Sequence, residues 1–427
     1  MIAMKATALA LLACTLALGA AAGTLPLVPW YSCDPATCLP ANNCQCATQQ
    51  APLPADQMPQ FILYTHDDGV VPDIVAAVNA TIGSRKNPNG CSIPLTWFTI
   101  RYDTEPYCSL VKQLWEQGHE IALHTRDHIR LDPPIDADKK DQMTSVKTWL
   151  NESCGIPLED MVGMRDPFLI NSPGTREVQH EMGLLYDSTI NEHWTKDGLW
   201  PTSANGSSRL WPYSMDHGIP QLCDATGPDG SCTQDERWPG LWEVPLWVLQ
   251  TSNYPMDAYA MDPGGDVFRL LKINFDAAYS GNRAPIPIYM HKPWMVEDSN
   301  QKYVQEFMDY VLANDDVWFV TMHQLIDWMR NPIPKSEMKA KFNVGCQAGG
   351  SNAVSTKSLT PAPAPAPPAS KPSSPPPAST PSPRPSPAAT PATPAPTPAP
   401  APASGAAAPA VSLAGAALVA LALALLL

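Results

Sequence analysis

The sequence predicts an α/β fold in which a parallel sheet closes into a barrel. Short apolar runs, typical of buried strands, alternate along the chain with stretches whose apolar residues recur at helical spacing. Such alternation favours parallel strands joined by helical crossovers. In addition, acidic, histidine and arginine residues stand where several of these runs end, and the carboxyl ends of the strands carry the chemistry of a βα barrel.

The predicted elements fall within residues 56–346, a length that suits one large domain. Strands are expected at Phe61–Thr65, Trp97–Ile100, Glu120–His124, Met161–Arg165, Leu184–Ser188, Leu241–Leu249, Ile286–His291 and Val317–Met322. Helices are expected at Pro72–Ile82, Cys108–Gln117, Asp136–Cys154, Gly174–Met182, Asp266–Ser280 and Asn300–Ala313. The spacing of these elements leaves the number of barrel strands open.

The N-terminus has the features of an export signal. Residues 1–23 combine Lys5, an Ala/Leu/Thr run and the small residues Ala20–Gly23, which is typical of a secretory signal peptide with its cleavage region. Residues 24–55 form a cysteine-rich extension before the large domain. We therefore expect a secreted protein.

The cysteine count favours disulfide bonds. Cys14 leaves with the signal peptide, so ten of the 11 cysteines remain, an even number in a secreted chain. Cys223 and Cys232 are spaced to close one surface loop. Four cysteines of the extension leave a zinc knuckle as the alternative to pairing: Cys33, Cys38, Cys44 and Cys46.

Composition excludes one class of partner. A net charge of −14 and a pI near 5.0 argue against a nucleic-acid-binding protein, which needs a basic face. Three N-glycosylation patterns, at Asn79, Asn151 and Asn205, agree with export and predict a glycoprotein.

The C-terminal region contains two appendages. Residues 347–404 are rich in Pro, Ala, Ser and Thr and have too few apolar side chains for a core, so they predict a disordered, extended stalk. Residues 405–427 end the chain in an apolar tail with no charge after it. This pattern favours a signal for a GPI anchor on the cell surface, with Ser404, Gly405 or Ala406 as the acceptor; a membrane-spanning helix is the alternative.

Two motifs predict a metal site. Asp67 and Asp68 follow the strand Phe61–Thr65, and adjacent buried carboxylates are tolerated when a cation shares their site. His124 and His128 stand four residues apart, a spacing that brings two imidazoles onto one face of a helical turn. Two histidines and one carboxylate are the ligands of a catalytic Zn²⁺ that keeps a position open for water.

A metalloprotease motif is excluded by spacing. His119 and His124 flank Glu120 in a pattern similar to His-Glu-x-x-His, but they are five residues apart instead of four. They cannot share a helix face as the protease motif requires. We expect His119 to be structural.

The ordered motifs resemble those of the polysaccharide deacetylases, carbohydrate esterase family 4. They are Thr65–Gly69, His124–His128, Arg165–Phe168 and Tyr289–His291, and several connecting stretches resemble the arthropod-type chitin deacetylases. The resemblance implies the family's distorted (β/α)7-type barrel and hydrolysis of acetyl groups on N-acetylglucosamine units of chitin or a related polysaccharide. Zn²⁺ is the expected metal, and Co²⁺ also fits such ligands.

The resemblance implies a role for each motif residue. Asp68, His124 and His128 bind the metal, and Asp67 is the general base that takes a proton from the metal-bound water. Arg165 holds Asp67 ionised and oriented, and the backbone N–H of Phe168 points at the developing oxyanion. His291 is the general acid that protonates the departing nitrogen.

Two positions depart from the family pattern. His66 stands where the family usually has an aromatic residue such as Phe, and Glu243 stands in place of an Asp in the motif that orients the acid histidine. The tryptophans of segment 191–240 either pack ordinary loops or stack on sugar rings: Trp194, Trp200, Trp211 and Trp238.

Two other functions remain open from the sequence. One is a catalytically silent carbohydrate-binding protein of a wall or matrix, because a member of such a family can keep the fold without the activity. The other is an acetyl esterase acting on acetylated xylan or another wall polysaccharide.

Overall fold

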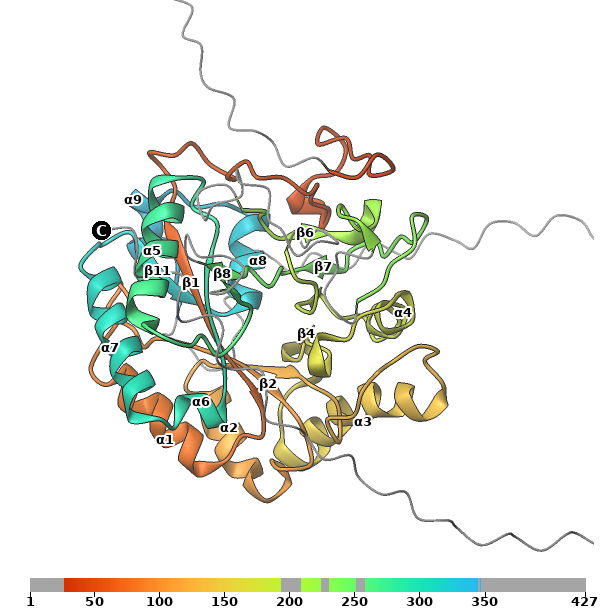
Figure 1. Ribbon diagram of the computed structural model, residues 1–427, viewed down its shortest axis with the longest axis horizontal. Helices are drawn as coiled ribbons and strands as arrows, with labels where there is room; N and C mark the ends of the chain where they lie inside the picture. The colour runs from red at the N-terminus through yellow and green to blue at the C-terminus, as the bar shows by residue number, and fades with distance from the viewer. Residues whose placement is uncertain (1–26, 193–208, 224–229, 251–257, 345, 347–427) are drawn as a thin grey trace, which may run out of the picture. The chain divides into compact units, whose positions relative to one another are not determined.

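The computed structural model describes residues 27–192, 209–223, 230–250, 258–344 and 346 (Figure 1). The chain divides into two units, Met1–Leu359 and Thr360–Leu427, and every described residue belongs to the first. The predicted signal peptide, stalk and apolar tail lie outside the described residues, as do Trp194, Trp200 and Asn205.

The described part of the chain contains one large mixed sheet. Its strands are β1 (Gln60–Asp68), β2 (Thr96–Thr99), β3 (Glu120–Leu123), β4 (Gly163–Met164), β5 (Tyr186–Asp187), β6 (Tyr213–Ser214), β7 (Trp242–Glu243), β10 (Ile286–His291) and β11 (Val317–Val320). The order is β10-β1-β2-β3-β4-β5-β7-β6, and β11 pairs with β1. All pairs are parallel except β6 with β7. Strands β8 (Leu249–Gln250) and β9 (Ala258–Tyr259) form a separate antiparallel pair.

The sheet is curled into a half-barrel, which confirms the predicted α/β class and its distorted barrel. Within the described residues no strand pair joins β10 to β6, so these two strands are the ends of the path. The predicted strand Leu241–Leu249 is wrong as a single element: its two ends belong to β7 and β8, which lie in different sheets. The other predicted strands all contain an observed strand or overlap one.

Helices α1 to α7 contribute buried residues to the apolar cluster on one face of β1, whereas α8 and α9 contribute to the cluster on its other face. Figure 1 shows α1 and α7 side by side. The α-helices are α1 (Pro72–Ile82), α2 (Cys108–Glu116), α3 (Ala137–Cys154), α4 (Pro173–Glu181), α5 (Val267–Ser280), α6 (Lys292–Met295), α7 (Asp298–Leu312), α8 (Met322–Arg330) and α9 (Lys335–Lys341). Every predicted helix is present within two residues at each end. Helices α6, α8 and α9 were not predicted from the sequence.

A capping box begins α8 and was a readable signal. The Thr321 hydroxyl accepts from the backbone N–H of Gln324, and the Gln324 side chain accepts from the backbone N–H of Thr321. Both groups would otherwise be left unpaired at the helix start. The apolar run of β11 continues directly into this helix. The change from the two-residue period of a strand to the 3.6-residue period of a helix is therefore hard to detect in the sequence.

Strand β1 is central because both of its faces are buried. Ile62 and Tyr64 belong to the apolar cluster that also contains residues of helices α1 to α7, whereas Phe61 and Leu63 belong to a second cluster. Side chains of a strand alternate between faces, so a continuous apolar run suits a strand that is covered on both sides. The same alternation places Asp67 on the face of Phe61 and Leu63.

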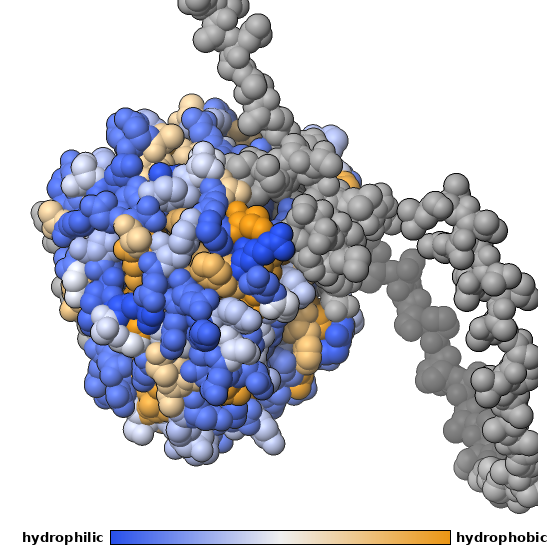
Figure 2. Space-filling model, turned by 60° about the vertical axis from the view of Figure 1, so that its left-hand side comes forward, coloured by the Kyte–Doolittle hydropathy of each residue, from blue (hydrophilic) through white to orange (hydrophobic). Residues whose placement is uncertain are grey.

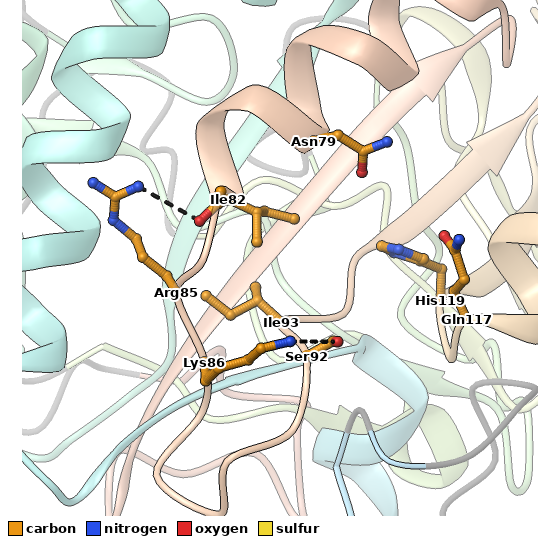
Figure 3. Close-up of a pocket in the computed structure, with 9 residues that line it drawn as sticks. Asn79, Ile82, Arg85, Lys86, Ser92, Ile93, Gln117 and His119 are labelled. Carbon is orange, nitrogen blue, oxygen red and sulfur yellow. Dashed lines mark hydrogen bonds between the residues drawn. The ribbon is translucent and has the colours of Figure 1, made fainter.

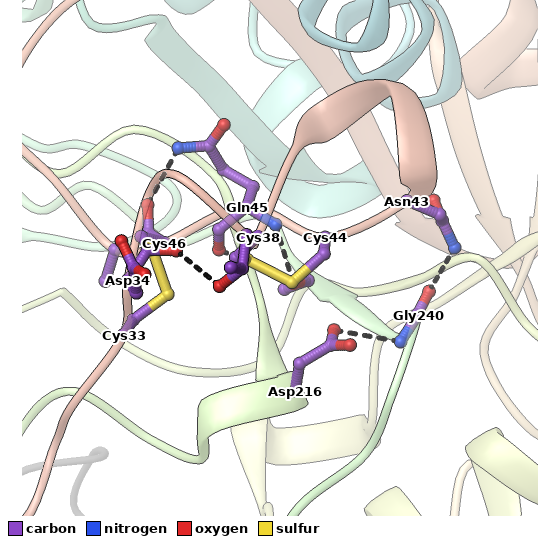
Figure 4. Close-up of a disulfide and its surroundings, with 12 residues drawn as sticks. Cys33, Asp34, Cys38, Asn43, Cys44, Gln45, Cys46, Asp216 and Gly240 are labelled. Carbon is purple, nitrogen blue, oxygen red and sulfur yellow. Dashed lines mark hydrogen bonds between the residues drawn. A yellow bond between two sulfur atoms is a disulfide. The ribbon is translucent and has the colours of Figure 1, made fainter.

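All ten cysteines after the signal peptide form disulfides. In the N-terminal extension Cys33 pairs with Cys46 and Cys38 with Cys44, so the zinc-knuckle alternative is wrong (Figure 4). Asn43 in the same segment donates to the Gly240 carbonyl at 2.9 Å and fixes the extension beside β7. The remaining pairs are Cys91–Cys346, Cys108–Cys154 and Cys223–Cys232, the last as predicted.

The visible face in Figure 2 is mostly polar, with small and separate hydrophobic spots. Among the helices of the described residues, none combines the length and the apolar character needed to cross a membrane.

Candidate active site

Three predicted metal ligands converge at the carboxyl ends of β1 and β3. The Asp68 Oδ1 atom lies 3.1 Å from His128 Nε2 and 3.7 Å from His124 Nε2. All the ligand atoms of these three residues lie within 4.8 Å of one another. The structure therefore brings together side chains from two segments separated by more than fifty residues.

The donor atoms of this cluster fit a cation. Asp68 Oδ1 and His124 Nε2 are buried and have no hydrogen-bond partner. Buried polar atoms without a partner destabilise a fold, and a bound cation would satisfy both. Two imidazole nitrogens and a carboxylate oxygen are also the donor types that Zn²⁺ and similar divalent metals prefer.

His124 is held in the form that can bind a metal. Its Nδ1 atom lies 2.7 Å from the Arg165 carbonyl oxygen, so Nδ1 carries the hydrogen and Nε2 keeps a lone pair. Burial lowers the pKa of His124 to about 3, and the opposing effect of Asp68 is smaller. The imidazole is therefore neutral at ordinary pH, as a metal ligand must be.

The expectation that His124 and His128 share a helical turn is wrong. Residues 124–128 form a loop, and Thr125 and His128 have positive φ values of 74° and 54°. Gln142 of α3 holds this loop: its side chain accepts from the Asp127 backbone N–H and donates to the Asp127 carboxylate, each at 2.9 Å. The two histidines meet at Asp68 because of the loop, not because of helical spacing.

Asp67 and Arg165 form a buried ion pair. Arg165 Nη1 donates to Asp67 Oδ1 at 2.7 Å, and the two side chains are 0% and 1% exposed. Burial raises the pKa of the Asp67 carboxyl above its ordinary value, although Arg165 lowers it. Arg165 thus orients the carboxylate as expected, but the net shift is upward, which makes Asp67 a stronger base.

The guanidinium of Arg165 is fixed on every side. Its Nε and Nη2 atoms donate to the carbonyl and hydroxyl oxygens of Ser188, at 2.8 Å and 2.9 Å. Its Cζ atom lies 4.2 Å from the ring centre of Phe98 and 4.6 Å from that of Tyr289. Aromatic faces attract a cation, so these two rings clamp the guanidinium beside Asp67.

His291 is oriented by Asp262, a residue that the sequence analysis missed. The Nδ1 atom of His291 lies 2.5 Å from Asp262 Oδ2, and its backbone N–H donates to Asp262 Oδ1 at 2.8 Å. Burial lowers the pKa of His291, but Asp262 together with Asp67 and Asp68 outweighs it and raises the pKa to about 9. His291 is thus protonated at neutral pH.

Phe168 occupies a strained turn at the edge of the site. Its φ of 58° is unusual for a bulky residue, and its ring is 51% exposed. The ring centre lies 4.6 Å from that of His128. The turn after Arg165 therefore places an exposed aromatic ring beside a predicted metal ligand.

Comparisons with known proteins decide the family. A model of the polysaccharide deacetylase family matches residues 56–186. Chitin deacetylase 8 of Bombyx mori is 32% identical over 344 residues, which cover 75% of this chain and 84% of that protein. The chain belongs to the polysaccharide deacetylase family. The motif resemblance is therefore confirmed, and the predicted enzyme class, a deacetylase hydrolase, is the class of this family.

Other matches include a second curated relative and two solved structures. Chitin deacetylase 1 of Bombyx mori is 31% identical over 336 residues, covering 72% of this chain and 58% of that protein, so the chain spans less than two thirds of this relative. The solved structure of PuuE allantoinase is 16% identical with a TM-score of 0.44 and covers 66% of this chain and 94% of its own. A family 4 carbohydrate esterase from Streptomyces lividans is 14% identical with a TM-score of 0.34, covering 62% and 93%.

The two departures from the family pattern have different surroundings. His66 is buried, and its ring centre lies 5.1 Å from that of Trp97 with no hydrogen-bond partner on either nitrogen. Burial lowers its pKa well below the ordinary value, so it packs as a neutral flat ring. Glu243 accepts from the Ile190 backbone N–H, and the carboxylate hydrogen-bonded to the predicted acid His291 is that of Asp262.

A separate pocket of about 450 Å³ lies away from this site (Figure 3). Its lining includes Lys86, Ser92 and His119, and none of its residues belongs to the predicted site. His119 and Ser92 precede β3 and β2, so the pocket opens at the amino ends of these strands, opposite the metal ligands. The His119 Nδ1 atom accepts from the Leu95 backbone N–H at 3.0 Å, as a structural histidine does.

Proposed function

We propose that the chain is a metal-dependent N-deacetylase that removes acetyl groups from N-acetylglucosamine units of chitin or a related polysaccharide. The observation that carries this proposal is the convergence of Asp68, His124 and His128 on one point, where Asp68 Oδ1 and His124 Nε2 are buried without a hydrogen-bond partner. Asp67, the candidate base, directly precedes the predicted metal ligand Asp68 in the sequence. Its carboxyl group also interacts electrostatically with His291, the candidate acid.

Asp68, His124 and His128 would hold the metal, with Zn²⁺ the first candidate and Co²⁺ the second. When bound, such an ion supplies Lewis acidity to the acetyl carbonyl and lowers the pKa of water to about 7. Asp68 cannot serve as the base while its lone pair faces the metal, which leaves that role to Asp67.

The remaining groups divide the proton transfers. The oxygen of water bonds to the acetyl carbon, and Asp67 accepts the proton that this water loses. Arg165 keeps the Asp67 carboxylate in position. His291 donates a proton to the glucosamine nitrogen as the carbon–nitrogen bond breaks, giving acetate and a free amine. The backbone N–H of Phe168 is our candidate donor to the developing oxyanion.

Chitin is the first substrate to test, because the two Bombyx mori relatives are named chitin deacetylases. We also propose that the catalytic domain spans residues 56–346, between a cysteine-rich extension and the stalk. Five disulfides suit an oxidising compartment, which supports export of a secreted glycoprotein. The GPI signal in residues 405–427 remains a sequence-based proposal; release of the protein from cells by a phosphatidylinositol-specific phospholipase tests it.

The decisive experiment measures acetate release from chitin oligomers and from acetylxylan, with metal-loaded protein and with chelator. We expect release from chitin oligomers that stops on chelation. Release only from acetylxylan would identify an acetyl esterase, and no release from disulfide-bonded, metal-loaded protein would identify a silent carbohydrate-binding protein.

The variant Asp67→Asn separates the roles of the two acids. It removes the base but leaves the three metal ligands, so turnover should fall by a factor of about 10² or more while metal content stays unchanged. Metal analysis and acetate release on the same preparation provide the test. Loss of the metal together with activity would show that the roles of Asp67 and Asp68 are reversed.

A further inference from the structure

Two aromatic rings are exposed on the described surface, and both belong to loops of the candidate site. Among the exposed large hydrophobic side chains of the described residues, Tyr102 at 71% and Phe168 at 51% are the aromatic ones. Exposed aromatic rings leave apolar surface in water, and at such positions they are typical of binding surfaces.

The sheet order places these two rings on either side of one metal-binding loop. Tyr102 follows β2, Phe168 follows β4, and the loop with His124 and His128 follows β3, which pairs with both strands. Loops at the carboxyl ends of adjacent parallel strands lie next to one another at the same edge of the sheet. The two segments that carry these rings therefore flank the segment 124–128.

Hydrogen bonds tie the Tyr102 segment directly to the metal ligands' own segments. The backbone N–H groups of Arg101 and Tyr102 both donate to the Arg126 carbonyl at 3.0 Å, and Ile100 N–H donates to the Asp68 carbonyl at 3.3 Å. A Cβ atom on Gly69 would lie 2.5 Å from Asp103 Cβ, so only glycine permits this close approach. Tyr102 is thus anchored by its backbone while its side chain remains exposed.

We propose that Tyr102 is a substrate-binding residue that stacks on a sugar ring of the polysaccharide, one or more units from the ring whose acetamide reacts. The identity of the sugar rests on the proposed function. A pyranose ring has an apolar face of C–H groups, which an exposed aromatic face can cover, and a β-linked polymer extends across the site far enough to meet rings on both sides of it. Phe168 offers the second such face, beside His128.

Binding of the N-acetylglucosamine hexamer by calorimetric titration tests this proposal. Tyr102→Ala in the full metal-loaded protein should weaken hexamer binding about three- to tenfold, whereas Tyr102→Phe and Tyr102→Trp should bind as the natural protein does, because they keep a ring. The matched control is Leu158→Ala, which removes another exposed apolar side chain, 48% exposed, from the turn that precedes β4 at the opposite end of the strands.

Each outcome of the titration supports or overturns the role of Tyr102. Because the titration measures binding, its result does not depend on whether the protein is catalytically active. Hexamer binding that weakens in Tyr102→Ala but not in Leu158→Ala supports it, whether or not the protein releases acetate. Equal affinity of Tyr102→Ala and the natural protein, or no hexamer binding by the natural protein, overturns it. Binding without acetate release would overturn the proposed deacetylase activity and leave the stacking role in place. Because Tyr102 is exposed, its variants should keep the thermal midpoint of the natural protein.

Discussion

At the scale of single residues, the position of Asp67 depends on Arg165, a buried charge whose side chain is hydrogen-bonded throughout. The guanidinium of Arg165 donates hydrogen bonds to Thr65, Asp67 and Ser188, and its Cζ atom lies 4.2 Å and 4.6 Å from the centres of two aromatic rings. A buried ion pair is tolerated only with such complete hydrogen bonding, because desolvation otherwise exceeds the attraction. The pairing fixes the position of Asp67 more than it stabilises the fold.

Asp262 gives the first prediction at this scale. Asp262→Asn removes one of the three carboxylates that raise the pKa of His291, and the one that is hydrogen-bonded to it, so the pKa should fall from about 9 toward the ordinary 6.5. As the proposed general acid, His291 must be protonated to act, so the alkaline limb of the pH–rate profile should move to lower pH, with a loss of roughly tenfold in kcat at pH 8.

The control for Asp262 is Asp73→Asn, which breaks the exposed pair between Asp73 and Lys292. It removes a nearby carboxylate without touching the hydrogen bonds of His291. An unshifted profile in Asp262→Asn, or an equal shift in both variants, would contradict the role of Asp262.

At the scale of elements, the loop 124–128 is positioned by a helix that contributes no ligand. Gln142 of α3 is 2% exposed and makes paired hydrogen bonds with Asp127, one residue before His128. Its backbone carbonyl also accepts from the Arg126 N–H. The conformation of the loop, with two positive φ values, is therefore imposed by α3 and not by the propensity of the loop itself.

Gln142→Ala should weaken metal binding without removing a ligand. Groups that orient metal ligands typically contribute about ten- to a hundredfold in affinity, and we expect a loss in this range. Competition for zinc with a chromophoric chelator measures it. Thr144→Ala on the exposed face of the same helix is the control, and equal zinc affinity of the two variants would show that Gln142 does not position His128.

Strands β4 and β5 pair at Gly163, where only a residue without a side chain fits against Tyr186. A Cβ atom on Gly163 would lie 1.9 Å from the ring of Tyr186, whose hydroxyl donates to Glu120 at 2.8 Å and so fixes the ring. The buried hydrogen bond between Tyr186 and Glu120 therefore leaves no room for a side chain at Gly163.

Gly163→Ala should lower the free energy of unfolding by about 3 kcal/mol or more, because the buried ring has no room to move. Gly183→Ala is the matched control: its new Cβ meets open space, and only the positive φ of 66° opposes it, at about 1 kcal/mol. Urea unfolding of both variants measures the difference. Equal losses would show that the ring can shift.

At the scale of the whole molecule, the described unit is closed by contacts between distant parts of the chain. β1 pairs with β10 and β11 from the far end of the sequence, and Cys91 is bonded to Cys346 across 255 residues. The N-terminal extension is fixed by two disulfides and by Asn43 beside β7. The site at the end of β1 is therefore held by both ends of the folded unit.

Removing the disulfide that closes the longest loop should destabilise the protein more than removing one that closes a short loop. The double variant Cys91→Ser with Cys346→Ser frees a loop of 255 residues and should lose about 5 kcal/mol, whereas Cys38→Ser with Cys44→Ser frees six and should lose about 2 kcal/mol. Denaturant unfolding compares them. A larger loss for the short pair would contradict the loop-entropy account.

Local sequence determined much of this protein. Periodicity predicted six of the nine α-helices of the described residues within two residues at each end. The apolar run before Asp67 predicted β1, because a strand buried on both faces needs continuous apolar side chains. Motif order was sufficient to recognise the family, since ligand and base candidates stand next to strand ends that can be read directly from the chain.

Only the tertiary structure decided which groups meet. Asp262 orients His291 across 29 residues while Glu243 bonds elsewhere, and α3 imposes a non-helical loop on the histidine pair. Four of the five disulfide pairs also belong to this class, because only Cys223–Cys232 was predicted from the sequence. No spacing rule links such residues, because their contacts result from how the sheet curls and the loops pack, whereas the local pattern of a sequence records only which face of each element is buried.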